Sequence, residues 1–214
     1  MMNIDNKEYY NDLINLRKQY DCWDLSKAVP KEDIEYILEQ VHRRAAVKQN
    51  EIKYKLKVID WSDPELRNDI FNYCVSKEET KTHSNGQTLA HWLILFQINR
   101  DFFSYNTRDD FNDAMLEYGI ALDMIAHSAA SIGLQSGFCR CFYKGYENKY
   151  RMFDKLNMPN GEKDFIVAVG IGHGIEAPNM INPYTGEKIK TWSRWEPEHV
   201  HNPKPDINSY VEFM

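Results

Sequence analysis

The sequence predicts an α+β fold, an α/β sandwich in which helices cover a sheet. Segments with apolar residues at helical spacing recur along the chain, and short continuous apolar runs lie between them. One further segment alternates charged and apolar residues, as a strand with one solvated face does. At 214 residues and 43% apolar composition, the chain suits a single domain over 1–214 with a substantial core.

Two helices are expected before the first strand. Residues 6–18 carry tyrosines and aliphatic residues at helical spacing. The segment 29–45 opens on Pro30, has acidic residues in its first turn and ends on Arg43 and Arg44. Proline at a helix start and cations at its end match the geometry and dipole of a helix, so this segment is expected to be helical throughout.

The sheet is expected to form from one amphipathic and several apolar strands. Lys53, Lys55 and Lys57 alternate with apolar residues and predict a strand over 53–60 with one wet face. Continuous apolar runs bounded by polar turns are typical of buried strands. On these patterns we expect further strands at 90–98, 136–144 and 164–172, and shorter helices at 63–75 and 146–157.

The stretch from Glu117 to Phe138 carries small and apolar residues on nearly every side of a helix, then turns at Gly133. A helix that is apolar all round is expected to be buried. Taken alone, the pattern fits an ordinary core helix that ends in a C-cap glycine. Asp123 and His127 lie one helical turn apart, and we expect them to form a structural hydrogen bond rather than a catalytic dyad.

Charge and hydropathy limit the classes of partner. The net charge of −6 argues against general nucleic-acid binding, although a local cationic pocket is compatible with it. No run approaches the roughly 18 apolar residues of a membrane span. The first residues lack a cationic segment followed by an apolar run, so a cytoplasmic chain is expected.

The cysteines and histidines give no strong metal signature. Cys22, Cys74, Cys139 and Cys141 lack the paired spacing of zinc ligands, and we expect reduced thiols. The short cluster of residues 198–201, with two histidines and a glutamate, is more typical of a polar surface than of a metal site. No metal is therefore expected.

The glycines of "GIGHGI" imitate a nucleotide-binding loop. Gly170, Gly172 and Gly174 do not have the spacing G-x-G-x-x-G, and no helix is predicted after them. A Rossmann interpretation therefore fails.

The order of elements and one motif resemble the FMN-dependent nitroreductase family. That family's core helix begins acidic-x-Gly-x-Ala and continues with a spacer of six to eight mostly apolar residues. A second alanine, three further residues and Gly-Leu-Gly-Ser/Thr then follow. Matching residues here, in order, are Glu117, Gly119, Ala121, Ala129, Gly133, Leu134 and Ser136. Gln135 departs from the motif's second glycine. The resemblance implies a mostly antiparallel central sheet with helices on both faces, and a homodimer with FMN in a groove between subunits. Residues 175–214 combine prolines with large aromatic side chains, so we expect an extended C-terminal segment packing on the partner subunit.

The resemblance further implies a phosphate-binding cluster before the second helix. Arg17, Lys18 and Gln19 correspond to that cluster, and Asp21 stands where the family has a cation. A carboxylate about 4 Å from a phosphate costs about 4 kcal/mol at an effective dielectric near 20. Asp21 must therefore turn away or be paired, or the phosphate is not bound. Arg17 and Lys18 are explained equally well as cations that close a helix.

Other flavin contacts follow from the same resemblance. Main-chain hydrogen bonds to the ring are expected from Phe138, Cys139, Arg140 and Cys141. Asn50 corresponds to a loop asparagine of the family, Asn85 could reach the polar edge of the flavin, and Lys190 and Arg194 would complete the phosphate site.

The implied activity is hydride and electron transfer from NAD(P)H through FMN to an electron-poor acceptor such as a nitroaromatic or a quinone. Two alternatives stay open. One is a specialised flavin enzyme of the same fold that dehalogenates or cleaves an activated ring. The other is a non-catalytic or degenerate flavin-binding dimer, which the altered phosphate cluster favours.

Overall fold

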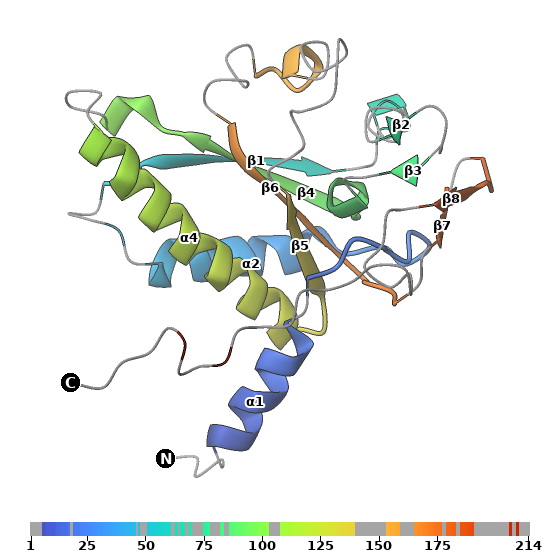
Figure 1. Ribbon diagram of the computed structural model, residues 1–214, viewed down its shortest axis with the longest axis horizontal. Helices are drawn as coiled ribbons and strands as arrows, with labels where there is room; N and C mark the ends of the chain where they lie inside the picture. Colours follow the sequence, from blue (N-terminus) through green and yellow to red (C-terminus); the bar gives the residue numbers. More distant parts are fainter. Residues whose placement is uncertain are drawn as a thin grey trace.

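A four-stranded antiparallel sheet forms the centre of the molecule, in the order β1-β4-β6-β5 (Figure 1). The strands are β1 (Tyr54–Asp60), β4 (Trp92–Ile98), β5 (Gln135–Cys139) and β6 (Phe165–Gly172). This computed structural model describes residues 6–17, 19–45, 47, 51–60, 63, 65–66, 69, 75–77, 82–83, 86–102, 108–139, 153–158, 165–176, 179–182, 185–190, 206 and 209. The α+β class and the antiparallel sheet predicted from the sequence are confirmed.

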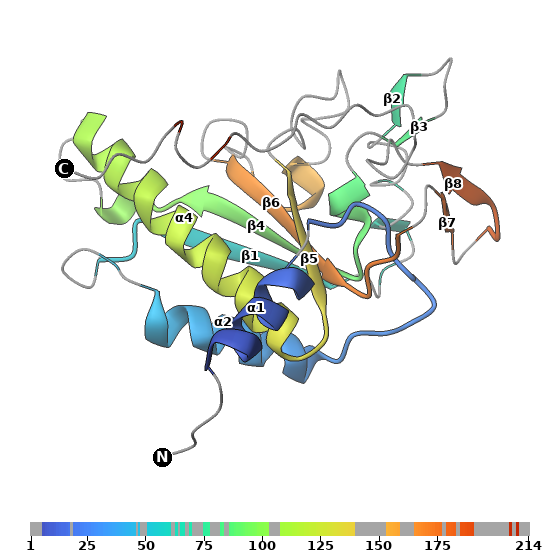
Figure 2. The same cartoon turned by 60° about the horizontal axis from the view of Figure 1, so that its bottom comes forward.

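Two helices cover one face of the sheet (Figures 1 and 2). α2 (Lys31–Arg44) follows Pro30, whose φ of −58° suits a helix start, and α4 (Arg108–Ser131) packs beside it. Between the helices and the sheet lies a core that includes Ile34, Ile37, Val41, Ile94, Phe96, Ala121, Ile125, Val167 and Val169. Burial of this apolar surface supplies the main driving force for packing this layer.

Shorter segments cover the opposite face of the sheet. Trp23 is buried there, and its indole N–H donates to the carbonyl of Gly86 at 2.8 Å. Gly86 opens the 3₁₀ helix η2 (Gly86–Leu89). The core on this side includes Cys22, Trp23, Leu89, Ala90, Leu93, Phe153, Leu156, Met180 and Ile189. Helical residues Leu66 and Phe153 also pack against it, so helical segments lie on both faces, as predicted.

Glycines allow this second layer to approach the sheet closely. Gly137 of β5 and Gly170 of β6 are direct cross-strand partners. A Cβ on Gly137 would lie 1.8 Å from the Tyr20 carbonyl oxygen, and one on Gly170 would lie 1.9 Å from that of Gln87. Since only glycine fits such an approach, the "GIGHGI" run serves packing in this chain.

The shorter elements differ from the expectations in detail. Glu65, Leu66 and Asp69 are helical, but Val75 already belongs to a strand, so the helix expected over 63–75 ends earlier. Of the helix expected over 146–157, the described residues 153–155 are helical. The remaining short elements are β2 (Val75–Lys77), β3 (Thr82–His83) and η3 (Arg100–Phe102).

Part of the C-terminal segment packs on its own chain. β7 (Asn179–Ile181) and β8 (Lys188–Lys190) form a two-stranded antiparallel ribbon. Met180 and Ile189 are buried against the second-face core. Residues 179–182 and 185–190 therefore pack on the second-face core of their own chain. Beyond residue 190 only Asp206 and Ser209 are described, so packing of that part on a partner stays a prediction.

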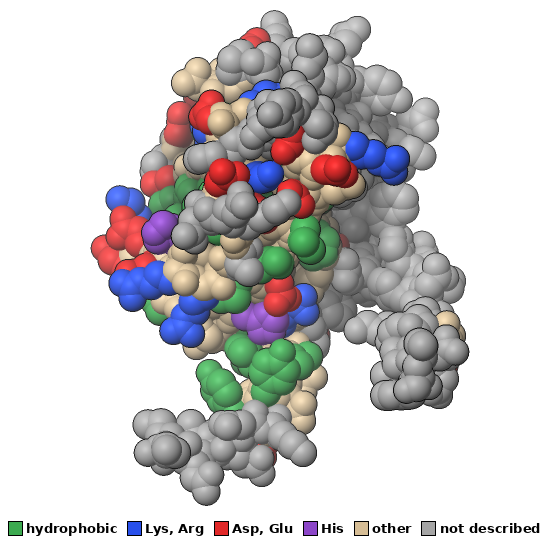
Figure 3. Space-filling model, turned by 90° about the vertical axis from the view of Figure 1, so that its left-hand side faces the viewer, with side chains coloured by type: hydrophobic (Ala, Val, Ile, Leu, Met, Phe, Trp, Pro, Cys, Tyr) green, Lys and Arg blue, Asp and Glu red, His purple; other side chains and the backbone are tan. Residues whose placement is uncertain are grey.

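The long helix α4 is buried on one side only. Ala114, Ala121 and Ile125 are buried, whereas Gly119 and Asp123 within the expected stretch are exposed, and Leu116 just before it is 66% exposed. Figure 3, which views the molecule from the left-hand side of Figure 1, shows apolar side chains among charged ones on that face. The expectation of burial all round is therefore not met within one chain. Across the described residues, no helix combines the length and the apolar character needed to cross a membrane.

The exit from α4 follows the expected glycine turn. Gly133 has a φ of 78°, a left-handed conformation that favours glycine. The N–H of Leu134 donates to the Ala129 carbonyl at 2.9 Å, and the N–H of Gly133 donates to that of Ala130 at 3.1 Å. This Schellman pattern ends the helix and directs the chain into β5.

Candidate functional site

The segment that follows helix α1 (Asn6–Leu16) lies along the free edge of β5. The main-chain N–H of Tyr20 donates to the Ser136 carbonyl at 3.0 Å. The side-chain amide of Gln19 donates to the Phe138 carbonyl at 3.0 Å. Residues distant in sequence, which the resemblance assigned to one flavin site, are thus brought together at this edge.

Strand geometry decides which groups of β5 face this edge. In an antiparallel ladder, the N–H and C=O of one residue point to the same side, and successive residues alternate. The carbonyls of Ser136 and Phe138 point away from β6, since both accept bonds from segment 19–20. The N–H of Phe138 is therefore directed to this edge as well. Its side chain is 50% exposed, so the edge offers an aromatic surface beside main-chain polar groups.

Cys139 occupies a different position from Phe138. It pairs with Ala168 of β6 and is buried, at 8% exposure. By the same alternation, its main-chain groups point into the sheet. Of the two described residues in the predicted stretch 138–141, only Phe138 presents main-chain groups to the edge.

Arg17 lies near the edge but is engaged with α4. Its guanidinium Nη2 is 2.9 Å from Oδ1 of Asp123. The second carboxylate oxygen of Asp123 is 3.1 Å from Nδ1 of His127, which confirms the predicted pairing of these two residues. The ring of Tyr10 stacks on His127, with centroids 6.4 Å apart. A polar network therefore joins the end of α1 to α4.

Asp21 faces the protein interior. It is 5% exposed and lies between Tyr20, whose carbonyl covers Gly137, and the fully buried Cys22. A residue lining an open anion cleft would be accessible, so this burial fits an Asp21 that turns away from such a cleft, one of the three outcomes that the sequence left open. Asp24 remains an anion nearby in sequence, because the Ser26 hydroxyl lowers the pKa of its carboxyl, Lys27 assists, and burial opposes the shift.

The other predicted site residues are less fully described. Lys190 ends β8, which lies away from α1 and α4 in Figure 1, and its side chain is outside the described set. The other predicted site residues that lie outside the described residues are Lys18, Asn50, Asn85, Arg140, Cys141 and Arg194. Within the described part of the chain, no group of three or more His, Cys, Asp or Glu side chains could hold a metal ion.

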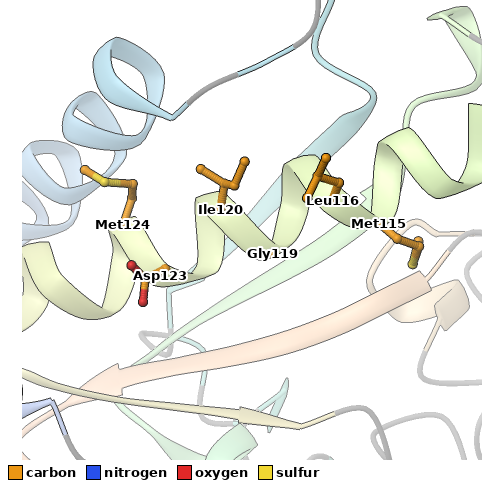
Figure 4. Close-up of a pocket in the computed structure, with 6 residues that line it drawn as sticks. All are labelled: Met115, Leu116, Gly119, Ile120, Asp123 and Met124. Atoms are coloured by element: carbon orange, nitrogen blue, oxygen red, sulfur yellow. The ribbon is translucent and has the colours of Figure 1, made fainter. Parts of the chain in front are cut away.

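A shallow hollow of about 360 Å³ lies on the outer side of α4. Leu116, Ile120 and Met124 point from the same side of the helix, with Gly119 between them (Figure 4). Met115 and Asp123 complete the lining. All lining residues come from one helix, so the hollow is a surface that a neighbouring element could cover rather than an enclosed pocket.

Asp123 is the residue of this region whose role was missed from the sequence. Its spacing from His127 indicates a pair, but nothing in the local pattern indicates Arg17, which is remote in the chain. Only the docking of α1 on α4 brings that cation to it.

Comparisons with known proteins find similarity in structure alone. No protein-family model matches the sequence, and no curated protein sequence matches it. Nitroreductase CinD from Lactococcus lactis, in complex with nicotinic acid, is 15% identical with a TM-score of 0.62, over 96% of this chain and 99% of that one. A nitroreductase with bound FMN from Bacteroides fragilis is 14% identical with a TM-score of 0.58, over 94% and 96% of the two chains.

A third similar structure is a Staphylococcus epidermidis protein assigned as an NAD(P)H:FMN oxidoreductase. It is 11% identical with a TM-score of 0.63, over 96% of this chain and 95% of that one. At such low identity, agreement over nearly the whole length shows a common architecture. The resemblance noted in the sequence is thereby confirmed for the arrangement of the chain, which has the nitroreductase fold.

Proposed function

We propose that this chain is a flavin-dependent oxidoreductase that uses FMN. The observation that carries the proposal is the β5 edge, where Gln19 and Phe138 meet on a fold shared with FMN-bound nitroreductases. An exposed aromatic ring beside outward main-chain groups suits a flat heteroaromatic ligand with polar atoms on its rim. The described residues therefore fit the ring portion of FMN.

FMN, when bound, supplies the redox chemistry, taking a hydride from NAD(P)H and passing electrons to an acceptor. The N–H of Phe138 would donate to a polar atom of the ring, and the Phe138 side chain would shield one part of it from water. Gln19 would fix this edge, since its amide holds the Phe138 carbonyl at 3.0 Å. Preorganised main-chain donors of this kind stabilise charge without reorganisation.

Arg17 is the described cation that would approach the phosphate, and it already pairs with Asp123. Lys18, Lys190 and Arg194 stay predicted phosphate ligands. Asn50, Asn85, Arg140 and Cys141 stay predicted contacts to the ring region.

A homodimer through the outer side of α4 is part of the proposal. Leu116 is an exposed large apolar residue there, and Gly119 has no atom within 4 Å of a Cβ position. A second copy related by a two-fold axis could bring its own α4 close at Gly119 and cover both apolar surfaces. The apolar composition of α4 on all sides then has a physical reason.

The substrates proposed are NAD(P)H and a small electron-poor acceptor such as a nitroaromatic or a quinone. Structural similarity to a protein assigned as an NAD(P)H:FMN oxidoreductase supports this class. A cytoplasmic location stays an expectation from the sequence.

The test is NAD(P)H oxidation by the FMN-loaded protein, with and without a quinone. Acceptor-dependent oxidation of NADH or NADPH is the expected result. If the protein binds FMN but oxidises neither NADH nor NADPH, the catalytic proposal is contradicted and the proposal of flavin binding stands.

The second candidate is a flavin-binding dimer without turnover. Two observations favour it: Arg17 is committed to Asp123, and Asp21 stands where the family has a cation. The same assay separates the two, since a binder would take up flavin without oxidising NAD(P)H.

A further inference from the structure

Asp123 belongs to α4, yet it contacts the segment that leads to the β5 edge. Oδ1 accepts from Arg17 at 2.9 Å, and Oδ2 lies 3.1 Å from Nδ1 of His127. The same Nδ1 lies 2.9 Å from the main-chain carbonyl of Asp123, so Arg17 is the charged partner assigned to this carboxylate. This arrangement draws the Arg17 guanidinium toward α4 and partly offsets its charge.

We propose that Asp123 is a positioning residue that holds Arg17 on α4 and thereby weakens selection for the phosphate of the flavin. This inference rests on the proposed function. Arg17 is suited to bidentate phosphate contact only when its guanidinium is free to turn toward the anion. Its pairing with Asp123 sets an anion in competition with that phosphate.

Neighbouring groups, like Asp123, weaken the attraction of this segment for a phosphate. The Gln19 amide donates to the Phe138 carbonyl, so it is committed to the strand edge rather than to an anion. Asp21 replaces a cation and faces the interior, and Asp24 is held ionised by Ser26 and Lys27. Among residues 17 and 19–24, which the structure describes, Arg17 is the only Arg or Lys side chain, and Lys18 beside it stays a predicted phosphate ligand.

The pair is also accessible enough to be altered by a ligand. The side chains of Arg17 and Asp123 are 39% and 50% exposed. Ion pairs at such exposure are weak, so a phosphate or a substitution can shift Arg17 between partners. Asp123 is therefore a residue that sets the preference between a flavin with a phosphate and one without it.

The experiment is a double-mutant cycle read out by binding. Full-length apoprotein is titrated with FMN and with riboflavin, and quenching of flavin fluorescence gives each Kd. Asp123→Asn is expected to raise the ratio of riboflavin Kd to FMN Kd by about two- to fivefold, because it frees the guanidinium from a competing charge. The riboflavin Kd itself should change by less than about twofold, since riboflavin has no phosphate.

Arg17→Ala completes the cycle. In the wild-type background it should change the ratio by less than about threefold, and in the Asp123→Asn background it should abolish the gain. Glu39→Gln is the charge-matched control, because it removes one carboxylate from a surface pair with Arg43 on α2. It should leave the ratio unchanged.

Several results would overturn the inference. One is an unchanged ratio in Asp123→Asn, and another is equal weakening of both flavins, which indicates a structural role alone. A loss of more than about tenfold in FMN affinity for Arg17→Ala would show that Arg17 already serves the phosphate. If neither flavin binds the wild-type protein, the proposed function fails, and this inference with it; FMN binding without the predicted ratio change overturns the inference alone.

Discussion

The carboxylate of Glu117 on α4 accepts a hydrogen bond from the main-chain N–H of Lys53 at 3.0 Å. Lys53 directly precedes β1, and Glu117 is only 3% exposed. The Lys53 ammonium also lies 3.4 Å from Asp110 and 3.5 Å from Asp113. Glu117, the acidic residue that opens the family-like motif, thus joins the central helix to the sheet.

Lys53→Met should lower the free energy of unfolding by about 2–3 kcal/mol. It removes a nearly buried cation and leaves two carboxylates without that partner. Urea denaturation followed by circular dichroism measures the change.

Lys55→Met, two residues further along the chain in β1, is the matched control. Lys55 pairs with Asp101, and both side chains are more than half exposed, so we expect a loss below about 0.5 kcal/mol. Equal losses in the two variants would contradict the assigned role of Lys53.

Tyr54 should make stability fall at alkaline pH. Burial raises the pKa of its phenol above the usual 10.0, and the charge of Glu117 adds to the shift. A raised folded-state pKa contributes stability that is complete below the unfolded pKa and is lost as pH rises through the folded one. The wild-type protein should therefore lose stability faster than Tyr54→Phe above about pH 10. The free energy of unfolding of both proteins is measured from pH 8 to 11. An equal decrease in the two proteins would contradict a raised pKa of Tyr54 in the folded state.

Gly137→Ala should destabilise the protein by at least about 2 kcal/mol. Its Cβ would lie 1.8 Å from the Tyr20 carbonyl, a main-chain atom that cannot rotate away, so segment 19–23 would have to move. Thermal unfolding compares this variant with Ser136→Ala on the same strand, for which we expect a loss below about 1 kcal/mol. Similar melting temperatures would show that the close approach carries little energy.

Leu116→Glu should dissociate the proposed dimer. Leu116 is 66% exposed in one chain, so glutamate there should affect the folded monomer little, while two buried carboxylates would face each other across a two-fold interface. Sedimentation equilibrium measures the change in mass. Tyr36→Glu on α2, where Tyr36 is 40% exposed, is the control and should leave the mass unchanged. A wild-type monomer, or a dimer that survives Leu116→Glu, would contradict an interface on this side of α4.

Local patterns predicted most of the fold. Pro30 and the terminal arginines of α2 act within the helix itself, and the alternating lysines of β1 reflect one strand's two faces. Gly133 was placed correctly because a left-handed C-cap is a local requirement. α4 begins at Arg108, before the stretch from Glu117 that the sequence singles out.

Contacts between distant segments could not be predicted in the same way. The bond from Gln19 to Phe138 and the pair of Arg17 with Asp123 depend on where α1 docks. Nothing in the sequence around Gly137 and Gly170 indicates which carbonyl groups lie over them. Family resemblance pointed to Gln19 and Phe138, whereas Asp123 became apparent only from the three-dimensional arrangement.

The most direct test of the account is an FMN titration of the wild-type protein and of Phe138→Asp, followed by flavin fluorescence. The account predicts saturable binding of one FMN per chain, and affinity at least about tenfold weaker in the variant, which places a carboxylate beside the ring. Phe138 is half exposed at a sheet edge, so the variant should remain folded, which circular dichroism checks. A wild-type chain that binds no FMN, or a folded variant that binds it equally well, would contradict a flavin site at this edge.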